Sequence, residues 1–216
     1  MGVNRCIAVL GGSFDPVHSG HVAMAELFVA LLAPDELRIL PAGNPWQKPP
    51  LKADAAQRIA MLRLAFEHLE VPVVIDEQEI HRQGATYTID TLKALRAEAG
   101  PQASIAFLIG ADQLLHLHTW KQWRQLFGHA HVCAASRPGF DMTALPPEVA
   151  QELSRRGGDA ARVRSTPHGL GLLAGNLAVD ISATQIRQAL RNDQPVGTLI
   201  PSAVLDYIQQ HHLYKN

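Results

Sequence analysis

Residues 11–21 read Gly-Gly-Ser-Phe-Asp-Pro-Val-His-Ser-Gly-His. A short apolar run at 6–10 ends at this stretch, and residues 21–32, which follow it, have helix-forming composition. Glycine lets the backbone turn tightly and approach a ligand closely, and Asp-Pro favours a turn. His18 and His21 stand at the start of the helical pattern, at a spacing that presents their imidazoles side by side. The stretch therefore predicts a strand, a phosphate-binding turn and a helix.

Short apolar runs and helical patterns alternate along most of the chain. Further strands are expected at 37–40, 73–75, 105–109 and 132–135, and further helices at 54–69, 88–99, 146–153, 180–187 and from residue 201 onward. Such alternation is typical of an α/β fold with a mostly parallel sheet and helices on both faces. Ligands bind at the carboxyl ends of the strands in such sheets. We expect four segments to meet there: the 11–21 turn, the 41–50 loop, residues 110–112 and the 180–187 turn.

Three stretches have less regular patterns. Trp120, Trp123 and Leu126 are spaced to share one face of a short helix. Residues 170–179 look like two strand pieces joined as a hairpin by a Gly-Asn turn. The arginines and the two glycines at 155–164 suggest a mobile basic loop.

The composition is that of a folded globular protein, since 47% of the 216 residues are hydrophobic and 18% are charged. A formal net charge of -1 gives no broad positive field, so we expect neither extended nucleic-acid binding nor attachment to an anionic membrane. The apolar run near the N-terminus is too short for a signal peptide, which favours the cytoplasm. Cys6 and Cys133 lie in predicted strands and are expected to be buried thiols, unless they pair as one disulfide.

A second motif stands near the C-terminus, where residues 181–187 read Ile-Ser-Ala-Thr-Gln-Ile-Arg. Together with residues 11–21 it resembles the two signatures of the nucleotidyltransferase superfamily. The resemblance implies a Rossmann-like, doubly wound fold. It also implies an enzyme that moves a nucleoside monophosphate from ATP or CTP onto a phosphate acceptor and releases pyrophosphate. Ala183 stands where the superfamily more commonly has serine, so no hydroxyl contact is expected from this position.

The residue types in the two motifs suit this chemistry. A phosphate oxygen that attacks the α-phosphorus is already an anion, so the protein has mainly to align the groups and stabilise their charge. His18, His21 and Arg187 are the candidate catalytic residues, because they donate hydrogen bonds or carry positive charge. Ser182 is expected to cap its helix and leave that N-terminus open for the β- and γ-phosphates. Mg²⁺ is expected to arrive with ATP, so no metal site within the protein is predicted.

The candidate ATP-binding residues come from both motifs and from the segment after the 105–109 strand. They are Gly11, Gly12, Ser13, Phe14, His18, His21, Gly110, Asp112, Ile181, Ser182, Thr184 and Arg187. Each group has a structural alternative. The two histidines would then be exposed to solvent, Arg187 would be solvated on its helix, and Asp112 would only cap the following helix.

Three further segments, 41–49, 84–92 and 107–123, resemble the bacterial nicotinate mononucleotide adenylyltransferases in particular. This resemblance implies that backbone amides of Thr86 and Tyr87 bind the nicotinate carboxylate and that Trp120 stacks on the pyridine ring. The implied residues of the mononucleotide site are Asn44, Lys48, Thr86, Tyr87, Asp112, Trp120 and Arg137. Core packing is the alternative for Trp120 and Trp123, and one of the two is expected to pack there. Gln47 stands where the family often has a histidine.

We therefore expect one nucleotidyltransferase domain over residues 1–216, with a Rossmann-like core at 1–180 and C-terminal helices at 181–216. The expected reaction transfers AMP from Mg·ATP to nicotinate mononucleotide and forms nicotinate adenine dinucleotide and pyrophosphate, a step of NAD biosynthesis. Nicotinamide mononucleotide and phosphopantetheine are alternative acceptors. A catalytically silent nucleotide-binding module is the alternative from another class. ATP and nicotinate mononucleotide are the expected partners. The sequence does not decide between a monomer and a homo-oligomer.

Overall fold

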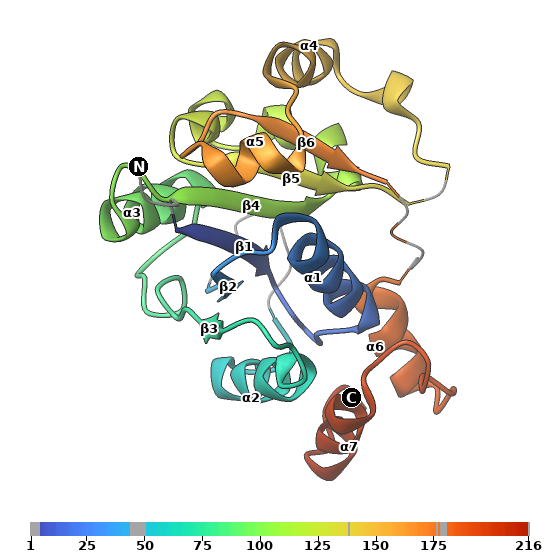
Figure 1. The fold of residues 1–216 in the computed structure, drawn as a ribbon. Coiled ribbons are helices and arrows are strands. Elements are labelled where there is room, and N and C mark those ends of the chain that lie inside the picture. The colour runs from blue at the N-terminus through green and yellow to red at the C-terminus, as the bar shows by residue number, and fades with distance from the viewer. Residues whose placement is uncertain (1–4, 44–50, 138, 176, 178–180, 216) are drawn as a thin grey trace.

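One parallel sheet forms the centre of the molecule (Figure 1). The computed structural model describes residues 5–43, 51–137, 139–175, 177 and 181–215. Six strands pair in the order β3-β2-β1-β4-β5-β6, and each pairing is parallel. The strands are β1 (Cys6–Gly12), β2 (Glu36–Pro41), β3 (Val73–Ile75), β4 (Ser104–Gly110), β5 (His131–Ala135) and β6 (Gly171–Ala174). The predicted parallel α/β sheet is confirmed.

Helices cover both faces of the sheet. The described α-helices are α1 (Ser19–Leu32), α2 (Ala55–Phe66), α3 (Thr88–Ala99), α4 (Pro147–Arg156), α5 (Ala160–Ser165), α6 (Ala183–Arg191) and α7 (Ser202–Gln210). Short 3₁₀ helices span Ala111–Leu115, Leu117–Thr119, Trp123–Gly128 and Met142–Ala144. One face carries α1, α2, α5, α6 and α7, and the other carries α3, α4 and the first three 3₁₀ helices. This arrangement confirms the predicted doubly wound, Rossmann-like fold.

Two hydrophobic cores lie on opposite faces of the sheet because side chains alternate along each strand. In β1, Ala8 and Leu10 join the core beneath α1, whereas Ile7 and Val9 join the core beneath α3. These four side chains are almost completely buried. A strand buried on both faces reads as a continuous apolar run, which is why the sequence pattern predicts it.

The order of the strands places a crevice between β1 and β4. The chain runs outward from β1 through β2 to β3, and then returns to β4 on the other side of β1. Connections that leave β1 and β4 therefore diverge to opposite faces and leave an opening at the carboxyl ends of these strands. Residues 11–21 and 110–112 lie at this point, as predicted.

Capping residues determine where two of the predicted helices begin. The Asp54 carboxylate accepts a hydrogen bond from the Gln57 amide at 2.8 Å, and Ser182 Oγ accepts one from the Gln185 amide at 3.2 Å. In both cases the glutamine side chain accepts a hydrogen bond in return from the backbone amide of the cap. The Ser182 cap is confirmed. The first of these helices, α2, ends at Phe66, three residues earlier than expected.

The prediction of a mobile basic loop at 155–164 is wrong. Arg155 and Arg156 belong to α4, and both guanidinium groups pair with Glu152, at 2.8 and 2.5 Å. Asp159 caps α5, and Arg164 on that helix donates hydrogen bonds to the carbonyls at the end of α1. The arginines are therefore held by a carboxylate one helical turn away and by backbone carbonyls distant in sequence.

Two further predictions need correction. Trp123 and Leu126 lie on a 3₁₀ helix, but Trp120 precedes it, because Gln122 has a left-handed backbone with φ of 53°. The predicted hairpin is not formed by the described residues. Leu177 donates its amide hydrogen to the carbonyl of Ser136, which directly follows β5. Leu177 therefore extends the parallel pairing of β5 with β6 and does not pair with β6 itself. Residues 178–180 lie outside the described part.

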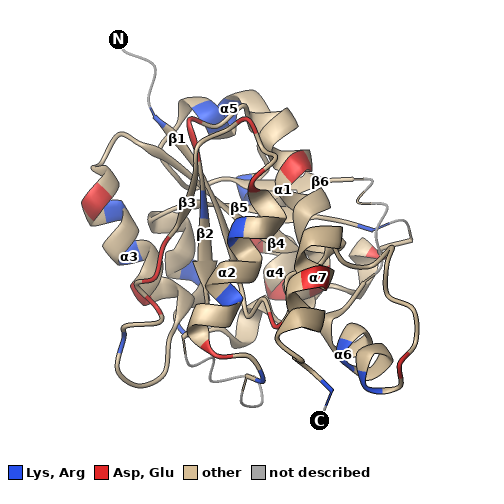
Figure 2. Cartoon of the chain, turned by 90° about the horizontal axis from the view of Figure 1, so that it is seen from below, with Lys and Arg blue, Asp and Glu red and all other residues tan. Residues whose placement is uncertain are grey.

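The distribution of charged residues, the hydrophobicity of the helices and the state of the cysteines can be compared with the predictions from composition. Figure 2 shows Lys and Arg interspersed with Asp and Glu over the side seen from below. Among the described helices, none has the length and hydrophobicity needed to cross a membrane. Cys6 and Cys133 are buried, unpaired thiols, and burial raises the pKa of each. The expectation of buried core thiols is confirmed, and the alternative disulfide is absent.

Candidate active site

A cavity of about 550 Å³ lies at the carboxyl ends of β1 and β4. It is lined by the turn after β1, the start of α1, the residues around the start of α3, the end of β4 and the first turn of α6. All predicted site residues within the described part line this one cavity: Gly11, Gly12, Ser13, Phe14, His18, His21, Thr86, Tyr87, Gly110, Asp112, Trp120, Arg137, Ile181, Ser182, Thr184 and Arg187. The predicted contacts of Asn44 and Lys48, and the position of Gln47, lie outside the described residues.

The two histidines of the first motif form a stacked pair. Their ring centroids are 3.7 Å apart, with 28° between the ring planes. His18 occupies the N-cap position of α1, and its backbone amide donates a hydrogen bond to Nδ1 of His21 at 3.2 Å. Because Nδ1 of His21 is an acceptor, a neutral His21 carries its proton on Nε2. That N–H is then a donor for a ligand.

His18 is buried in the wall of the cavity, with 7% of its surface exposed. Burial, and secondarily the positive charge of Arg137, lowers the pKa of His18 to about 4. Nδ1 of His18 is buried and has no hydrogen-bond partner among the described residues. A buried polar atom normally has a partner. An anionic ligand would supply one and would favour the protonated ring. The alternative of two solvent-exposed histidines is therefore rejected.

A hydrogen bond joins the two sequence motifs. Arg187 Nη1 on α6 donates to the backbone carbonyl of Asp15 at 2.6 Å, and Nη2 donates to Thr184 Oγ1 at 3.2 Å. Ser182, the cap of α6, also lines the cavity. The half-buried guanidinium group therefore connects the start of α6 to the turn that carries the histidines, which the alternative of a purely solvated side chain does not explain.

The buried carboxylate of Asp15 joins the same turn to two distant segments by hydrogen bonds. It is 3% exposed and accepts hydrogen bonds from the amides of Lys52 and Ala53, at 2.8 and 3.0 Å, and from the Tyr214 hydroxyl at 2.8 Å. The buried side chain of Arg58 donates to the Ser13 carbonyl at 3.0 Å. The sequence assigns Asp15 only to a turn and gives no sign of the contacts to Tyr214 and Arg58. These contacts join segments that are far apart in the chain.

Two glycines make room for side chains at the floor of the cavity. A Cβ atom on Gly12 would lie 3.0 Å from the Phe14 ring, and one on Gly110 would lie 2.5 Å from a carboxylate oxygen of Asp112. The buried Phe14 also has a positive φ, of 48°. Gly110 occupies the N-cap position of the following 3₁₀ helix, and Asp112 lies within its first turn, so Asp112 is not the N-cap residue.

Thr86, Tyr87 and Trp120 lie together at another side of the cavity. Tyr87 is the N-cap residue of α3, and the Lys121 ammonium lies 4.1 Å from the centre of its ring. Trp123 is 6% exposed and packs in the core, whereas Trp120 lines the cavity. The buried Nε1 of Trp120 has no hydrogen-bond partner in the described part. One of the two tryptophans is thus a core residue, as expected.

Sequence reasoning missed other residues that line the cavity together with Thr86, Tyr87 and Trp120. Glu79 and Lys121 are the charged members of this group. The phenyl ring of Phe107, in the middle of β4, also reaches the cavity and contacts Trp120 edge to face, with ring centroids 6.3 Å apart. Lys121 lies within the 107–123 segment and could have been inferred from it, whereas Glu79 lies in an irregular segment with no periodic signal.

Comparisons with known proteins identify the family. The cytidylyltransferase-like family model matches residues 9–189. A protein of Herminiimonas arsenicoxydans, named "Probable nicotinate-nucleotide adenylyltransferase", is 62% identical over 216 residues, which cover 99% of each chain. The chain belongs to the nicotinate-nucleotide adenylyltransferase family. A relative of the same name from Chromobacterium violaceum is 45% identical over 214 residues, which cover 99% of this chain and 100% of the relative.

A solved structure agrees with the fold of this adenylyltransferase. Nicotinic acid mononucleotide adenylyltransferase of Plasmodium falciparum, complexed with NaAD, superposes with a TM-score of 0.76 at 18% identity and covers 98% of both chains. Adenylyltransferases use ATP with a metal ion. The described residues contain no group of three or more His, Cys, Asp or Glu side chains that could hold a metal. The donors that line the cavity, among them His18, His21 and Arg187, suit the phosphate oxygens of a nucleotide bound together with such an ion.

Proposed function

We propose that the chain transfers AMP from Mg·ATP to nicotinate mononucleotide and forms nicotinate adenine dinucleotide, a step of NAD biosynthesis. A phosphate oxygen of the mononucleotide bonds to the α-phosphorus of ATP. The bond from that phosphorus to the oxygen bridging the α- and β-phosphates breaks, and pyrophosphate leaves. Both substrates are anions, so binding and reaction need positive charge and fixed hydrogen-bond donors rather than a strong base.

The single observation that carries this proposal is the hydrogen bond between Arg187 and the Asp15 carbonyl. It brings the guanidinium group, the start of α6 and the stacked His18–His21 pair to one cavity. Three features that each favour phosphate binding then act on the same ligand. Separately, each of them would be a weak indication.

The catalytic residues bind the phosphates of ATP. His21 donates Nε2–H, and His18 takes up a proton as the negative charge approaches its buried ring. Arg187 and the first turn of α6 stabilise the negative charge that develops on the leaving pyrophosphate. The glycines and Phe14 of the 11–14 segment lie under the nucleotide. We propose Mg²⁺ as the metal, bound to the phosphates, where it neutralises part of their charge.

The acceptor lies against Thr86, Tyr87 and Trp120. Trp120 stacks on the pyridine ring, and the amides of Thr86 and Tyr87 donate to the carboxylate, a geometry that favours the acid over the uncharged amide. Arg137 binds the phosphate of the mononucleotide. Arg137 lines the same cavity as His18 and His21, and its guanidinium group would bind that phosphate with charge-assisted hydrogen bonds.

Three wider expectations complete the proposal. The reaction takes place in the cytoplasm, where ATP and pyridine nucleotides are available. The chain acts as one domain, because α6 and α7 share the core of the α1 face with β1. The binding partners are ATP and nicotinate mononucleotide, and a homo-oligomer remains compatible with the site.

Pyrophosphate release from Mg·ATP, measured with different acceptors, tests this function. We expect rapid release with nicotinate mononucleotide and at least tenfold lower kcat/KM with nicotinamide mononucleotide or phosphopantetheine, which corresponds to about 1.4 kcal/mol or more of discrimination. His21→Ala should abolish release and leave the melting temperature close to that of the wild type. Absence of release with every acceptor would favour a silent nucleotide-binding module, and equal rates with both pyridine nucleotides would contradict the selectivity.

A further inference from the structure

An irregular segment between β3 and α3 forms much of one wall of the cavity. Its residues Glu79, Thr86 and Tyr87 line the cavity, together with Thr88 and Thr91 at the start of α3. Residues 76–87 form turns and bends, with one isolated β-bridge at Thr86, and contain no helix or longer strand. Backbone hydrogen bonds, such as the one from the Asp76 amide to the Ile39 carbonyl, hold parts of this wall, and side-chain contacts add to them.

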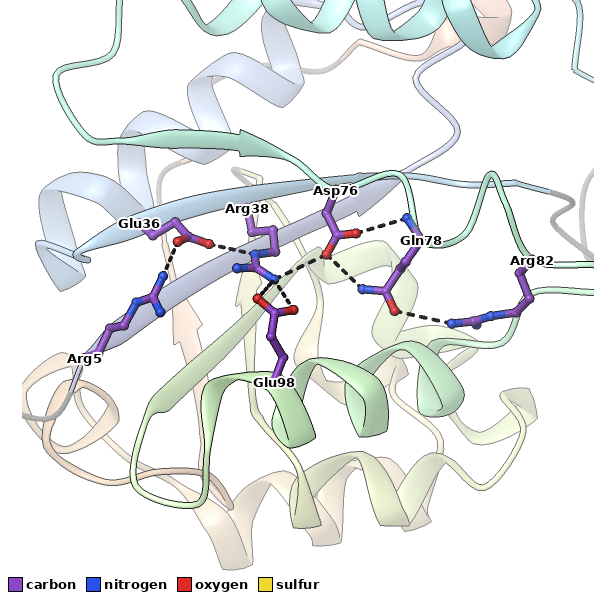
Figure 3. A network of polar contacts seen from close by, with 7 residues as sticks. All are labelled: Arg5, Glu36, Arg38, Asp76, Gln78, Arg82 and Glu98. Carbon is purple, nitrogen blue, oxygen red and sulfur yellow. Dashed lines mark hydrogen bonds and ion pairs between the residues drawn. The ribbon is translucent and has the colours of Figure 1, made fainter.

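A buried arginine anchors the beginning of the segment. The Arg38 side chain on β2 is 7% exposed. It donates hydrogen bonds to Glu36 at 2.7 Å, to Glu98 at 2.8 Å and to Asp76 at 3.4 Å (Figure 3). Arg5 pairs with the other carboxylate oxygen of Glu36. Because Asp76 directly follows β3, these contacts join the first residue of the segment to β2 and α3.

The hydrogen bonds continue from Asp76 toward the cavity. Gln78 donates its amide group to Asp76 at 2.9 Å and accepts from Arg82 at 3.4 Å (Figure 3). Arg82 also donates to the Thr91 hydroxyl at 3.0 Å, and that hydroxyl donates to Glu79 at 2.7 Å. The network therefore ends at a carboxylate on the cavity wall.

Glu79 is held by both its side chain and its backbone. Burial raises the pKa of its carboxyl group, whereas hydrogen bonds from the hydroxyls of Thr91 and Thr86 and the charge of Arg82 lower it. The backbone of Gly43, just after β2, packs so closely that a Cβ atom there would lie 1.9 Å from the Glu79 carbonyl oxygen. Glu79 thus links the end of β2 to the residues that precede and begin α3.

We propose that Glu79 is a positioning residue for the acceptor, acting through Thr86. The carboxylate accepts hydrogen bonds from the hydroxyls of Thr86 and Thr91. It so holds the 86–87 backbone in the conformation that presents its amides to an acid group on a flat ring. A donor pair fixed in advance binds its ligand without the cost of ordering a loop. This inference rests on the proposed function, since it concerns the acceptor of that reaction.

The test compares Glu79→Gln with Glu36→Gln, a control in the same polar network. Both changes remove a carboxylate charge from the same polar network, but the partners of Glu36 are Arg5 and Arg38, which do not line the cavity. For Glu79→Gln we expect KM for nicotinate mononucleotide to rise about tenfold, with KM for ATP and kcat within about twofold of the wild type. The preference for the acid over the amide should fall. Glu36→Gln should change none of these values.

Arg82→Ala is a second variant, in case Glu79→Gln does not fold. It removes the hydrogen bonds to Gln78 and Thr91 from a partly buried position, and KM for nicotinate mononucleotide should rise about threefold. The inference is overturned if folded Glu79→Gln and Arg82→Ala keep the wild-type KM for this acceptor. It is also overturned if Glu36→Gln raises that KM equally. A wild-type enzyme that releases no pyrophosphate with nicotinate mononucleotide would instead remove the proposed function itself.

Discussion

Replacing His18 with glutamine should change how stability depends on pH. The folded protein keeps this imidazole buried and neutral, with a pKa of about 4 against an ordinary value of 6.5. In the unfolded chain the ring is solvated and binds a proton below pH 6.5. Glutamine has a polar side chain of similar length but does not titrate. The comparison therefore isolates the protonation of this single ring.

The expected magnitude follows from the two pKa values. They differ by about 2.5 units, and each unit corresponds to about 1.4 kcal/mol, so the total is about 3 kcal/mol. Because the folded pKa is the lower one, the unfolded state binds more protons between pH 6.5 and 4. The wild type is therefore fully stabilised above pH 6.5 and loses this contribution as the pH falls to 4. The pKa of His131 is also lowered to about 4, but that residue is present in both proteins and cancels.

Thermal unfolding without nucleotide, followed in steps from pH 7 to pH 4, measures the effect. We expect the melting temperature of the wild type to fall relative to His18→Gln by roughly 6–12 °C across this range, given about 2–4 °C per kcal/mol for a chain of this size. The test is the change, between pH 7 and pH 4, in the difference between the two melting temperatures. The size of that difference at pH 7 does not test the reasoning. If the two proteins respond to pH in parallel, His18 is not buried as a neutral group and the reasoning fails.

Three other changes test neighbouring parts of the site. Tyr214→Phe removes one of the three donors that the described residues supply to the buried Asp15 carboxylate, and it should destabilise the protein by about 1–3 kcal/mol, read as a lower melting temperature in scanning calorimetry; an unchanged value would contradict the role of this contact. Gly110→Ala places a Cβ atom 2.5 Å from the Asp112 carboxylate and should raise KM for ATP severalfold with little loss of stability; an unaltered KM would show that Asp112 is not used. When ATP binds at pH 6, the wild type should take up close to one proton at His18, and His18→Gln should lack this uptake. Titration calorimetry in buffers of different ionisation enthalpy measures the number of protons; equal uptake by both proteins would place the proton elsewhere.

Local patterns predict the elements well because their causes are local. The strand at β1 is a continuous apolar run, and the start of α2 is set by Asp54 with Gln57 three residues later. Both signals lie within a few residues of the structure they specify. The two nucleotide motifs were likewise found as contiguous stretches, and their meeting in one cavity follows from the topology of a parallel sheet.

The missed features depend on partners far away in the chain. Tyr214 meets Asp15 across 199 positions, and no periodicity near either residue indicates this contact. Arg58 and Arg164 were not recognised as anchors, because an arginine on an amphipathic helix is usually solvated and only the fold supplies the carbonyls they bind. Glu79 lies in a segment without regular structure, where sequence patterns carry little information.

The central claim is that residues 11–21 and 181–187 form one nucleotide site beside the acceptor wall at Thr86, Tyr87 and Trp120. A crystal structure with bound nicotinate adenine dinucleotide tests it most directly. We predict the adenylyl part between Gly11 and α6, the phosphates within hydrogen-bond distance of the histidine pair, and the pyridine ring stacked on Trp120 with its carboxylate at the Thr86 and Tyr87 amides. A dinucleotide bound elsewhere, or with the ring away from Trp120, would contradict the account.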